Sequence, residues 1–216
     1  MIENLHGRNY ELAKAEADKV DEQIIEVLQA GHSFRVEAGA GSGKTYSLNK
    51  VIEWIQSNKY SRKKQNVICI TYTNAAVNVI AERLSKDSFI LPSTIHSFAW
   101  NAIKQYQSFL INIVTTDPDF LPDEGDFLKI TEVTYTLGHR YKENGIQYLY
   151  HDDVLKLFCT LLDNAKFRRV FLDKYPLILI DEYQDSYSPI IERFIKYFIA
   201  EEKGPQFGFF GDAWQT

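Results

Sequence analysis

Apolar and polar positions change period along the N-terminal part of the chain, which predicts a helix, a strand and a second helix. Residues 11–30 place Ala, Val, Ile and Leu at helical spacing among charged residues, and Gly31 ends that pattern. The segment SFRVEA, residues 33–38, follows with the pattern of a short strand. Helical periodicity returns in YSLNKVIEWIQSN, residues 46–58, after a stretch rich in glycine.

Later segments repeat this alternation of apolar runs and helical patterns. VICITY, residues 67–72, predicts a buried strand, and TNAAVNVIAERLS, residues 73–85, predicts a helix that begins at Thr73 or Asn74. An apolar stretch, a fourth strand, a helix and a further strand follow at residues 90–100, 177–180, 190–200 and 207–210. Strands that alternate with helices predict an α/β fold, with a parallel sheet covered by helices on both faces.

The segment of residues 101–176 interrupts this alternation. It holds an acidic loop, TTDPDFLPDEGD, and a predicted hairpin whose turn is KENG. The two arms of the hairpin alternate Val133, Tyr135 and Leu137 on one side and Ile146, Tyr148 and Tyr150 on the other. We therefore predict an inserted subdomain at residues 101–176, between two parts of the main domain at residues 1–100 and 177–216.

Composition limits the classes of protein that remain. The 216 residues, 45% of them apolar, are enough for one large domain with an insert. A net charge of −5 argues against simple electrostatic coating of DNA but leaves room for a local basic groove. Cys69 and Cys159 are too few for a disulfide framework or a zinc site. Without a signal peptide or a membrane-spanning run, the sequence predicts a soluble, cytoplasmic protein with no membrane partner.

The glycine-rich stretch GAGSGKT has the pattern of a phosphate-binding loop. Glycines let backbone N–H groups converge on an anion, and the following helix N-terminus adds partial positive charge. In such a loop Lys44 would reach the β- and γ-phosphates, and the Thr45 hydroxyl would bind Mg²⁺. The backbone cradle would be formed by Ala40, Gly41, Ser42 and Gly43. Ala38 stands where the usual pattern has glycine, and the alternative is a plain glycine-rich turn.

A pair of carboxylates ends the predicted strand of LILIDEYQDS. Ligands of parallel sheets bind at the carboxyl ends of the strands. At that edge Asp181 could hold Mg²⁺, and Glu182 could orient and deprotonate an attacking water. The alternative is a helix N-cap cluster formed by Asp181 and Asp185. Together with the phosphate loop, the pair predicts a nucleoside triphosphatase.

Five segments in order, GAGSGKT, TYTNAA, TIHSF, IDEYQDS and GDAWQT, resemble the N-terminal motor half of the superfamily 1 helicases of the UvrD/Rep type. The resemblance implies a RecA-like domain that uses ATP and Mg²⁺ to move along single-stranded DNA or unwind a single-strand/duplex junction, in the 3′-to-5′ direction. It also implies a second motor domain after Thr216, with the arginines that stabilise the transferred phosphoryl group. We therefore expect these 216 residues alone to bind ATP–Mg²⁺ weakly and to hydrolyse it slowly.

The same resemblance assigns roles to three glutamines. Gln23 would read the adenine edge, for which a side-chain amide has both donor and acceptor. The alternatives are a solvated Gln23 or the same role for Gln29. Gln184 would sense the γ-phosphate or its water. Gln215, with Asp212 in GDAWQT, would couple the nucleotide state to DNA, and the neighbouring Trp214 would either pack the DNA groove or fill space.

Two of the resembling segments would contact DNA. The expected DNA-binding residues are Thr71, Thr73 and Asn74 in TYTNAA and Thr94, His96, Ser97 and Phe98 in TIHSF. The ring of Phe98 would offer a face on which a base stacks. The alternatives are helix capping by Thr73 or Asn74 and burial of His96 and Phe98 in the core.

Other features leave the function open in part. The run Arg62, Lys63 and Lys64 has the pattern of a solvated face, and Asp152 with Asp153 favours a helix start over a metal pair. A nucleotide-gated sensor that binds DNA or a partner nuclease without unwinding is the alternative to a helicase, and such helicase-like subunits occur in some antiphage systems. A small-molecule kinase would leave YTNAA and TIHSF without a role.

Overall fold

The computed structural model describes residues 3–39, 43–58, 65–121, 124–125, 129–201 and 204–212. Its centre is a five-stranded sheet in which every neighbouring pair is parallel. The strands run in the order β1 (Phe34–Glu37), β9 (Gln206–Gly211), β8 (Leu177–Asp181), β2 (Val67–Thr71) and β3 (Ile90–Thr94). The predicted α/β fold with a parallel sheet is therefore confirmed.

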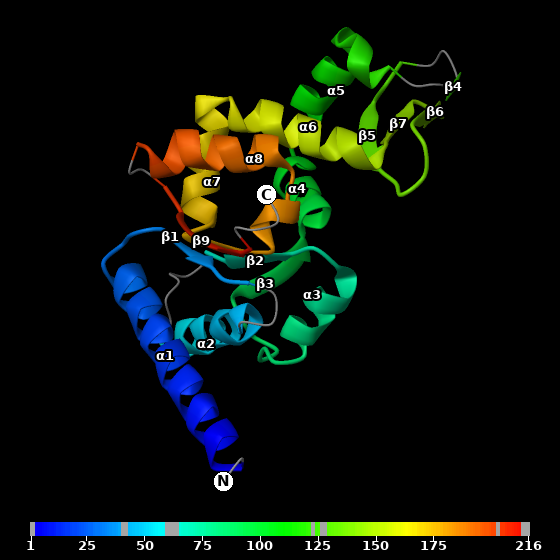
Figure 1. The fold of residues 1–216 in the computed structure, drawn as a ribbon. Helices are drawn as coiled ribbons and strands as arrows, with labels where there is room; N and C mark the ends of the chain where they lie inside the picture. Colours follow the sequence, from blue (N-terminus) through cyan, green and yellow to red (C-terminus); the bar gives the residue numbers. More distant parts are fainter. Residues whose placement is uncertain are drawn as a thin grey trace.

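Helices cover both faces of this sheet (Figure 1). On one face lie α1 (Glu3–Gln29), α2 (Lys44–Ser57) and α3 (Asn74–Ala81). On the other lie α4 (Ile95–Ile103), α6 (His151–Leu162), α7 (Ala165–Lys174) and α8 (Ser188–Phe194), which continues as a π-helical turn at Ile195–Ile199. No helix in the described part of the chain has the length and apolar character needed to cross a membrane.

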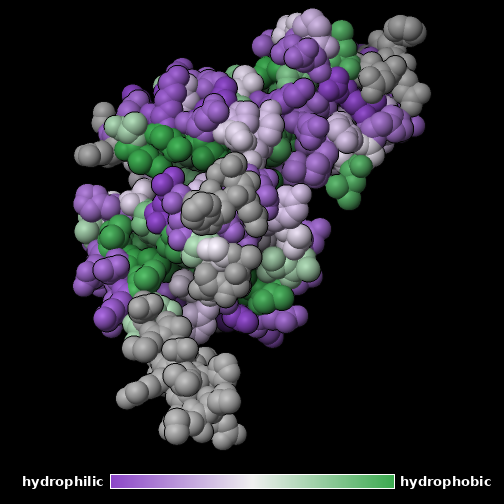
Figure 2. Space-filling model, in the orientation of Figure 1, coloured by the Kyte–Doolittle hydropathy of each residue, from purple (hydrophilic) through white to green (hydrophobic). Residues whose placement is uncertain are grey.

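Two apolar clusters, one on each face, explain why the central strands are apolar throughout. Successive side chains of a strand point to opposite faces. Cys69 and Leu179 accordingly pack with α1 and α2, whereas Ile68 and Ile178 pack with α4, α6 and α8. The outer surface is more polar, and Figure 2 shows hydrophilic residues over most of the face in view, with hydrophobic residues gathered along α8 and near the C-terminal end of α1.

A second, smaller sheet lies away from the first, beside α5 (Gln107–Thr116) and a short 3₁₀ turn at Pro118–Phe120 (Figure 1). Its strands run in the order β4 (Glu124–Gly125), β6 (Tyr141–Glu143), β7 (Ile146–Leu149) and β5 (Glu132–Tyr135). Helix α6 leads from this sheet back to the main one. The predicted division into residues 1–100, 101–176 and 177–216 stays a prediction, and α4 continues across its first boundary.

The predicted hairpin is correct in its turn and wrong in one arm. Asn144 and Gly145 form the turn with φ values of 53° and 77°, as the two central residues of a tight hairpin require. This turn joins β6 to β7, which are antiparallel, whereas β5 pairs with β7 in parallel. A two-residue turn pairs the residues that flank it directly, so the more distant segment at Val133 has to reach the other edge of β7.

Candidate functional site

The phosphate-loop pattern connects β1 to α2, as predicted. Gly43 precedes the helix with φ at +91°, a conformation that residues with a side chain rarely adopt. No side chain caps this end of α2 among the described residues, so the first N–H groups of the helix are available to an anion. The predicted roles of Ala40, Gly41 and Ser42 concern positions outside the described residues and stay predictions.

Lys44 is the first residue of α2, and its side chain is buried in the loop. Its Nζ donates to the carbonyl of Ala38 at 2.7 Å and to that of Gly39 at 3.3 Å. Carbonyl groups of the loop itself therefore hold the ammonium group. A bound phosphate would replace them as its hydrogen-bond partner. Thr45, the next residue, is exposed, so its hydroxyl is open to a ligand.

The two predicted carboxylates stand at the end of β8. Asp181 is half-buried, and Glu182 turns the chain with φ at 47°. Burial first, and then the charge of Glu182, raise the pKa of Asp181. The backbone N–H of Glu182, 3.2 Å from Asp181 Oδ1, and the positive charge of Lys44 act in the opposite direction. Because β1, β9 and β8 are parallel neighbours, the phosphate loop after β1 and the acidic end of β8 lie at the same edge of the sheet.

Gln184 bridges the acidic motif and the end of β9. Its Nε2 donates to Glu182 Oε2 at 2.8 Å, and its Oε1 accepts from the backbone N–H of Asp212 at 3.2 Å. Gly211 makes room for this bridge, because a Cβ there would press against Gln184 Oε1 and lie 2.5 Å from the ring of Tyr183. A carboxylate at the predicted catalytic position is thus linked by one side chain to the segment predicted to couple nucleotide and DNA.

The order of the strands brings these motifs together. Since β9 lies between β1 and β8, the GDAWQT segment begins between the phosphate loop and the acidic pair. The backbone N–H of Ala38 donates to Gly211 O at 3.1 Å, which ties the start of the loop to the end of β9. Trp214 and Gln215 lie outside the described residues, so the nucleotide contact of Gln215 stays a prediction.

The structure does not identify which glutamine would contact the adenine ring. Gln23 lies on α1 with an exposed side chain, and Gln29, its competitor, is exposed at the end of the same helix. The adenine contact of Gln23 therefore stays a prediction.

TYTNAA has mixed outcomes. Thr73 caps α3, accepting a hydrogen bond from the Ala76 N–H at 3.1 Å, so the capping interpretation is confirmed. Thr71 is buried and donates to the carbonyl of Thr73 at 3.3 Å, so the expectation that its hydroxyl faces a phosphate is wrong. Asn74 is exposed at the start of α3. Tyr72, which is not among the residues expected from the sequence to contact DNA, is 67% exposed between them.

Tyr72 carries a signal by which it can be identified. It follows directly after a buried strand, at the carboxyl edge where ligands of parallel sheets bind. An aromatic side chain at such a position has no sheet face to cover. The apolar run VICITY assigns Tyr72 to the strand instead, but the strand ends one residue earlier, at Thr71.

TIHSF begins at the neighbouring strand end. Thr94 pairs in register with Thr71, so α3 and α4 start side by side at the carboxyl edge of the sheet. The Thr94 hydroxyl accepts from the Ser97 N–H at 3.3 Å and donates to Ser97 Oγ at 3.0 Å. Both hydroxyl groups therefore stand at a helix N-terminus, a favourable place for a phosphate.

Phe98 does not offer a face to a base. Its side chain is 2% exposed, and its ring makes edge contacts with Phe158, Phe171 and Tyr175. Phe98 lies four residues after Thr94, about 6 Å further along the axis of α4, where the helix packs against α6 and α7. The stacking prediction for Phe98 is wrong, and the alternative of burial in the core is confirmed.

His96 joins α4 to α6. Its ring stacks on His151 with centroids 3.3 Å apart, and its Nε2 is buried without a partner among the described residues. Burial first, and then His151, lower the pKa of His96 to about 4, against the opposing charge of Asp152. His151 Nδ1 lies 2.6 Å from the hydroxyl of Tyr135. Any direct DNA contact of His96 stays a prediction.

The carboxylates at the start of α6 have a structural role. Asp153 is buried, accepts from Tyr150 N at 2.9 Å and makes a two-pronged ion pair with Arg140. No group of three His, Cys, Asp or Glu residues within the described ranges is placed to hold a metal ion. The helix-start interpretation is thus confirmed. The run Arg62, Lys63 and Lys64 lies outside the described residues.

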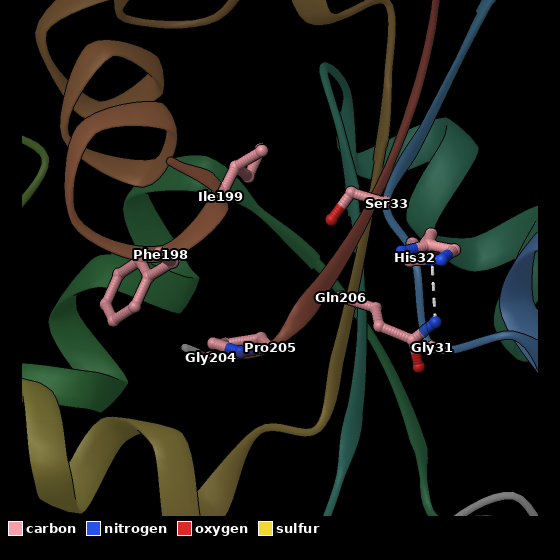
Figure 3. A pocket seen from close by; sticks show the side chains of 8 residues that line it. All are labelled: Gly31, His32, Ser33, Phe198, Ile199, Gly204, Pro205 and Gln206. Carbon is pink, nitrogen blue, oxygen red and sulfur yellow. Dashed lines mark hydrogen bonds between the residues drawn. The ribbon is translucent and has the colours of Figure 1, made fainter. Parts of the chain in front are cut away.

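A cavity of about 350 Å³ lies at the opposite end of the main sheet, where β1 and β9 begin (Figure 3). There Gln206 points toward the turn after α1, and its Nε2 donates to the carbonyls of Leu28 and His32, both at 3.0 Å. The amide is used to anchor α1, and the cavity is remote from Lys44 and Asp181 along the strands.

Comparison with known proteins agrees with this geometry. The family described as AAA domain matches residues 21–216. Gabija protein GajB of Bacillus cereus (strain HuB5-5) is 26% identical over 271 aligned residues, which cover 82% of this chain and 40% of that protein.

Two named helicases are also similar. An ATP-dependent helicase/nuclease subunit of Anoxybacillus flavithermus is 30% identical over 188 residues, 76% of this chain and 14% of that protein. The ATP-dependent DNA helicase Rep of Buchnera aphidicola is 41% identical over 75 residues, 32% of this chain and 11% of that protein. The chain thus spans less than half the length of each of these relatives. With this match and the phosphate loop, acidic strand end and parallel sheet described above, the chain belongs to the AAA domain family, among its UvrD/Rep-like helicase members.

Proposed function

We propose that the chain is the first motor domain of an ATP-dependent DNA helicase or translocase. The observation that carries the proposal is the strand order, which brings the phosphate loop after β1 and the carboxylates at the end of β8 to the sheet edge where α3 and α4 also begin. A phosphate loop, a carboxylate that could bind Mg²⁺ and two helix N-termini then lie at one edge of the sheet. A protein that couples ATP hydrolysis to movement on DNA needs its nucleotide site and its DNA site to be close in this way.

The residues at this edge fit ATP–Mg²⁺. Lys44 would leave the carbonyls of Ala38 and Gly39 and bind the β- and γ-phosphates, and the open N-terminus of α2 would add its N–H groups. Thr45 and Asp181 supply the oxygen ligands that Mg²⁺ prefers. Bound ATP–Mg²⁺ supplies the phosphoryl group and the charge that activates it.

Glu182 would hold and deprotonate the attacking water, and Gln184 would keep its carboxylate in place. The hydrogen bond from Gln184 to Glu182 orients one carboxylate oxygen and leaves the other to the water. Because the same amide accepts from Asp212 N, a shift of Glu182 during hydrolysis would be felt at the end of β9. This is the connection through which the nucleotide state would reach the DNA path.

The DNA path would cross the starts of α3 and α4. Thr94, Ser97 and Asn74 would contact phosphates from the helix N-termini. The exposed ring of Tyr72 would stack on a base, the role expected for Phe98 from the sequence. The proposed 3′-to-5′ direction of movement rests on the resemblance to UvrD/Rep-type helicases and on no residue described above.

Binding measurements on this chain test the two halves of the proposal separately. A fluorescent ATP analogue with Mg²⁺ should bind the wild type, and Lys44→Ala should weaken it by about tenfold or more, since a charge-assisted contact to phosphate is lost. Tyr72→Ala should leave nucleotide binding unchanged and weaken binding of oligo(dT) about fivefold to tenfold. The proposal is wrong if Lys44→Ala binds the nucleotide as the wild type does.

A nucleotide-gated sensor that engages DNA or a nuclease without unwinding is the second candidate. It is supported by the similarity to Gabija protein GajB over 82% of this chain and to a protein named as part of a helicase/nuclease. A strand-displacement assay on the full-length protein separates the candidates. Unwinding that disappears in Lys44→Ala favours the helicase, and ATP-dependent binding of a nuclease partner without unwinding favours the sensor.

A further inference from the structure

A carboxyl group on α1 is buried without a hydrogen-bond donor. The side chain of Asp21 is 6% exposed, and neither of its carboxyl oxygens has a partner within the described residues. Removing a carboxylate from water is costly unless it is paired, and buried polar groups of native proteins nearly always have partners. The position therefore points to a donor that arrives from outside the described part of the chain.

Asp21 lines a cavity of about 470 Å³ between α1 and α2. The acidic residues Asp18, Glu22 and Glu53 line it as well, with the indole of Trp54. The cavity is formed by the C-terminal half of α2, about 15 Å along the helix axis from Lys44 at its start. It is thus separate from the nucleotide edge of the sheet.

Negative charge dominates this cavity. Of the described residues that line it, Asp18, Asp21, Glu22 and Glu53 carry carboxylates and Lys50 carries an ammonium group. That ammonium lies 3.6 Å from Glu53 Oε2 and 5.4 Å from the centre of the Tyr46 ring, so it is directed to the rim. The remaining negative charge favours a cation.

The donor set selects an organic cation over a metal ion. In the described ranges no three His, Cys, Asp or Glu residues come together as metal ligands. The carbonyls of Glu53 and Trp54 already accept from Ser57 Oγ and Asn58 Nδ2, both at 2.9 Å. A guanidinium group needs fewer carboxylates than a metal ion does. Its planar N–H donors form two hydrogen bonds to one carboxylate, and its face stacks on an indole.

We propose that the cavity between α1 and α2 binds a guanidinium cation, presented as an arginine side chain by a protein partner. Asp21 accepts the two-pronged hydrogen bond, Trp54 packs against the plane of the cation, and Asp18 and Glu22 attract it. Arginine is among the residues that anchor protein interfaces, which is why a partner protein is the source. The inference does not depend on the proposed motor function, since it uses none of the residues at the nucleotide edge.

Peptide binding by isothermal calorimetry tests the proposal. The peptide Ac-Gly-Arg-Gly-NH₂ should bind the wild-type chain at least tenfold more tightly than the same peptide with citrulline, which has the shape of arginine without its charge. Asp21→Asn should remove this preference, whereas Glu192→Gln, a matched change at an exposed carboxylate on α8, should keep it. Equal binding of the two peptides, or an unchanged preference in Asp21→Asn, would overturn the site.

Agmatine, a small free guanidinium compound, distinguishes the source of the guanidinium group. A protein partner predicts that the peptide binds at least as tightly as agmatine, because backbone on both sides adds contacts at the rim. Tighter binding of agmatine than of the peptide would overturn the assignment to a partner protein. Lys44→Ala should bind the arginine peptide as the wild type does, so failure of the motor proposal would be seen separately.

Thermal unfolding gives a second readout that a structural role for Asp21 would move in the opposite direction. Asp21→Asn removes an unpaired buried carboxylate and should raise the unfolding midpoint by about 2–4 °C. A lower midpoint would mean that the carboxylate already has a partner within the chain, which contradicts the site.

Discussion

The carboxyl edge of the main sheet and the contact between α4 and α6 are neighbouring regions that differ in how tightly their side chains are packed. At the edge, Glu182 and Gly43 have positive φ values, Lys44 donates to two carbonyls of its own loop, and Gln184 spans two segments. In the α4–α6 contact, rings pack on rings, with Phe98 fully enclosed. Strained and lightly packed groups can respond to a ligand, whereas the packed contact can only hold its neighbours in place.

The difference shows how a short segment divides its work. Within TIHSF, Thr94 and Ser97 stand at the open edge, and Phe98, the next residue, is in the core. His96 lies between the two environments, with its ring stacked on α6. A mutation within these few residues should therefore affect either the site or the stability, depending on whether the residue lies at the open edge or in the core.

The largest expected effect comes from emptying the packed region. Phe98→Ala should lower the free energy of unfolding by about 3–5 kcal/mol, because a buried ring is removed from a close-packed layer. Denaturant unfolding measures this loss. Phe98→Leu, which keeps most of the apolar volume, should retain more than half of the stability lost in the alanine variant. A loss below about 1 kcal/mol for Phe98→Ala would contradict the described packing.

A smaller loss of stability, with a larger loss of function, is expected from filling space at the edge. In Gly211→Ala the new Cβ would displace the Gln184 amide and press on the Tyr183 ring, at a cost of about 1–3 kcal/mol. ATP turnover in the full-length protein should fall at least tenfold, since Glu182 loses its partner. Gly138→Ala is the matched control, because its nearest neighbour would lie 4.0 Å away. Unchanged turnover in Gly211→Ala would separate Gln184 from catalysis.

Much of the edge could be predicted from the sequence because its signals are local. GAGSGKT and the Asp181–Glu182 pair follow apolar strands directly, so the strand ends carry them to the same edge of a parallel sheet. Thr73 as a helix cap follows equally from its neighbours. These features need no knowledge of what packs against them.

The remaining features depend on partners far along the chain. Phe98 is buried because α6 and α7 cover α4, and Tyr72 is exposed because β2 ends one residue earlier than its apolar run suggests. The parallel pairing of β5 with β7 depends on which strand the Asn144–Gly145 turn selects. The buried carboxyl of Asp21 could not be recognised from its sequence, in which it is one acidic residue of a charged helix.

The smallest expected effect is a pH dependence at the boundary between the two regions, through His96. Its pKa is lowered from 6.5 to about 4 in the folded chain, so the fold favours the neutral ring. As the pH falls, His96 is protonated near pH 6.5 in the unfolded chain but only near pH 4 in the folded chain. The stabilising contribution is therefore complete above pH 6.5 and is lost as the pH falls toward 4.

Unfolding measured across that range in the wild type and in His96→Phe isolates this effect from the titration of carboxylates. A tenfold change in proton affinity corresponds to about 1.4 kcal/mol, and solvent screening of the half-exposed ring reduces the total to about 1–2 kcal/mol. The groups that face the ring are His151, Asp152 and, through His151, Tyr135. Phenylalanine keeps a ring against His151 without the titration, so the difference in stability between the two proteins should shrink as the pH falls from 6.5 to 4. A constant difference over this interval would mean that the fold does not lower the pKa of His96.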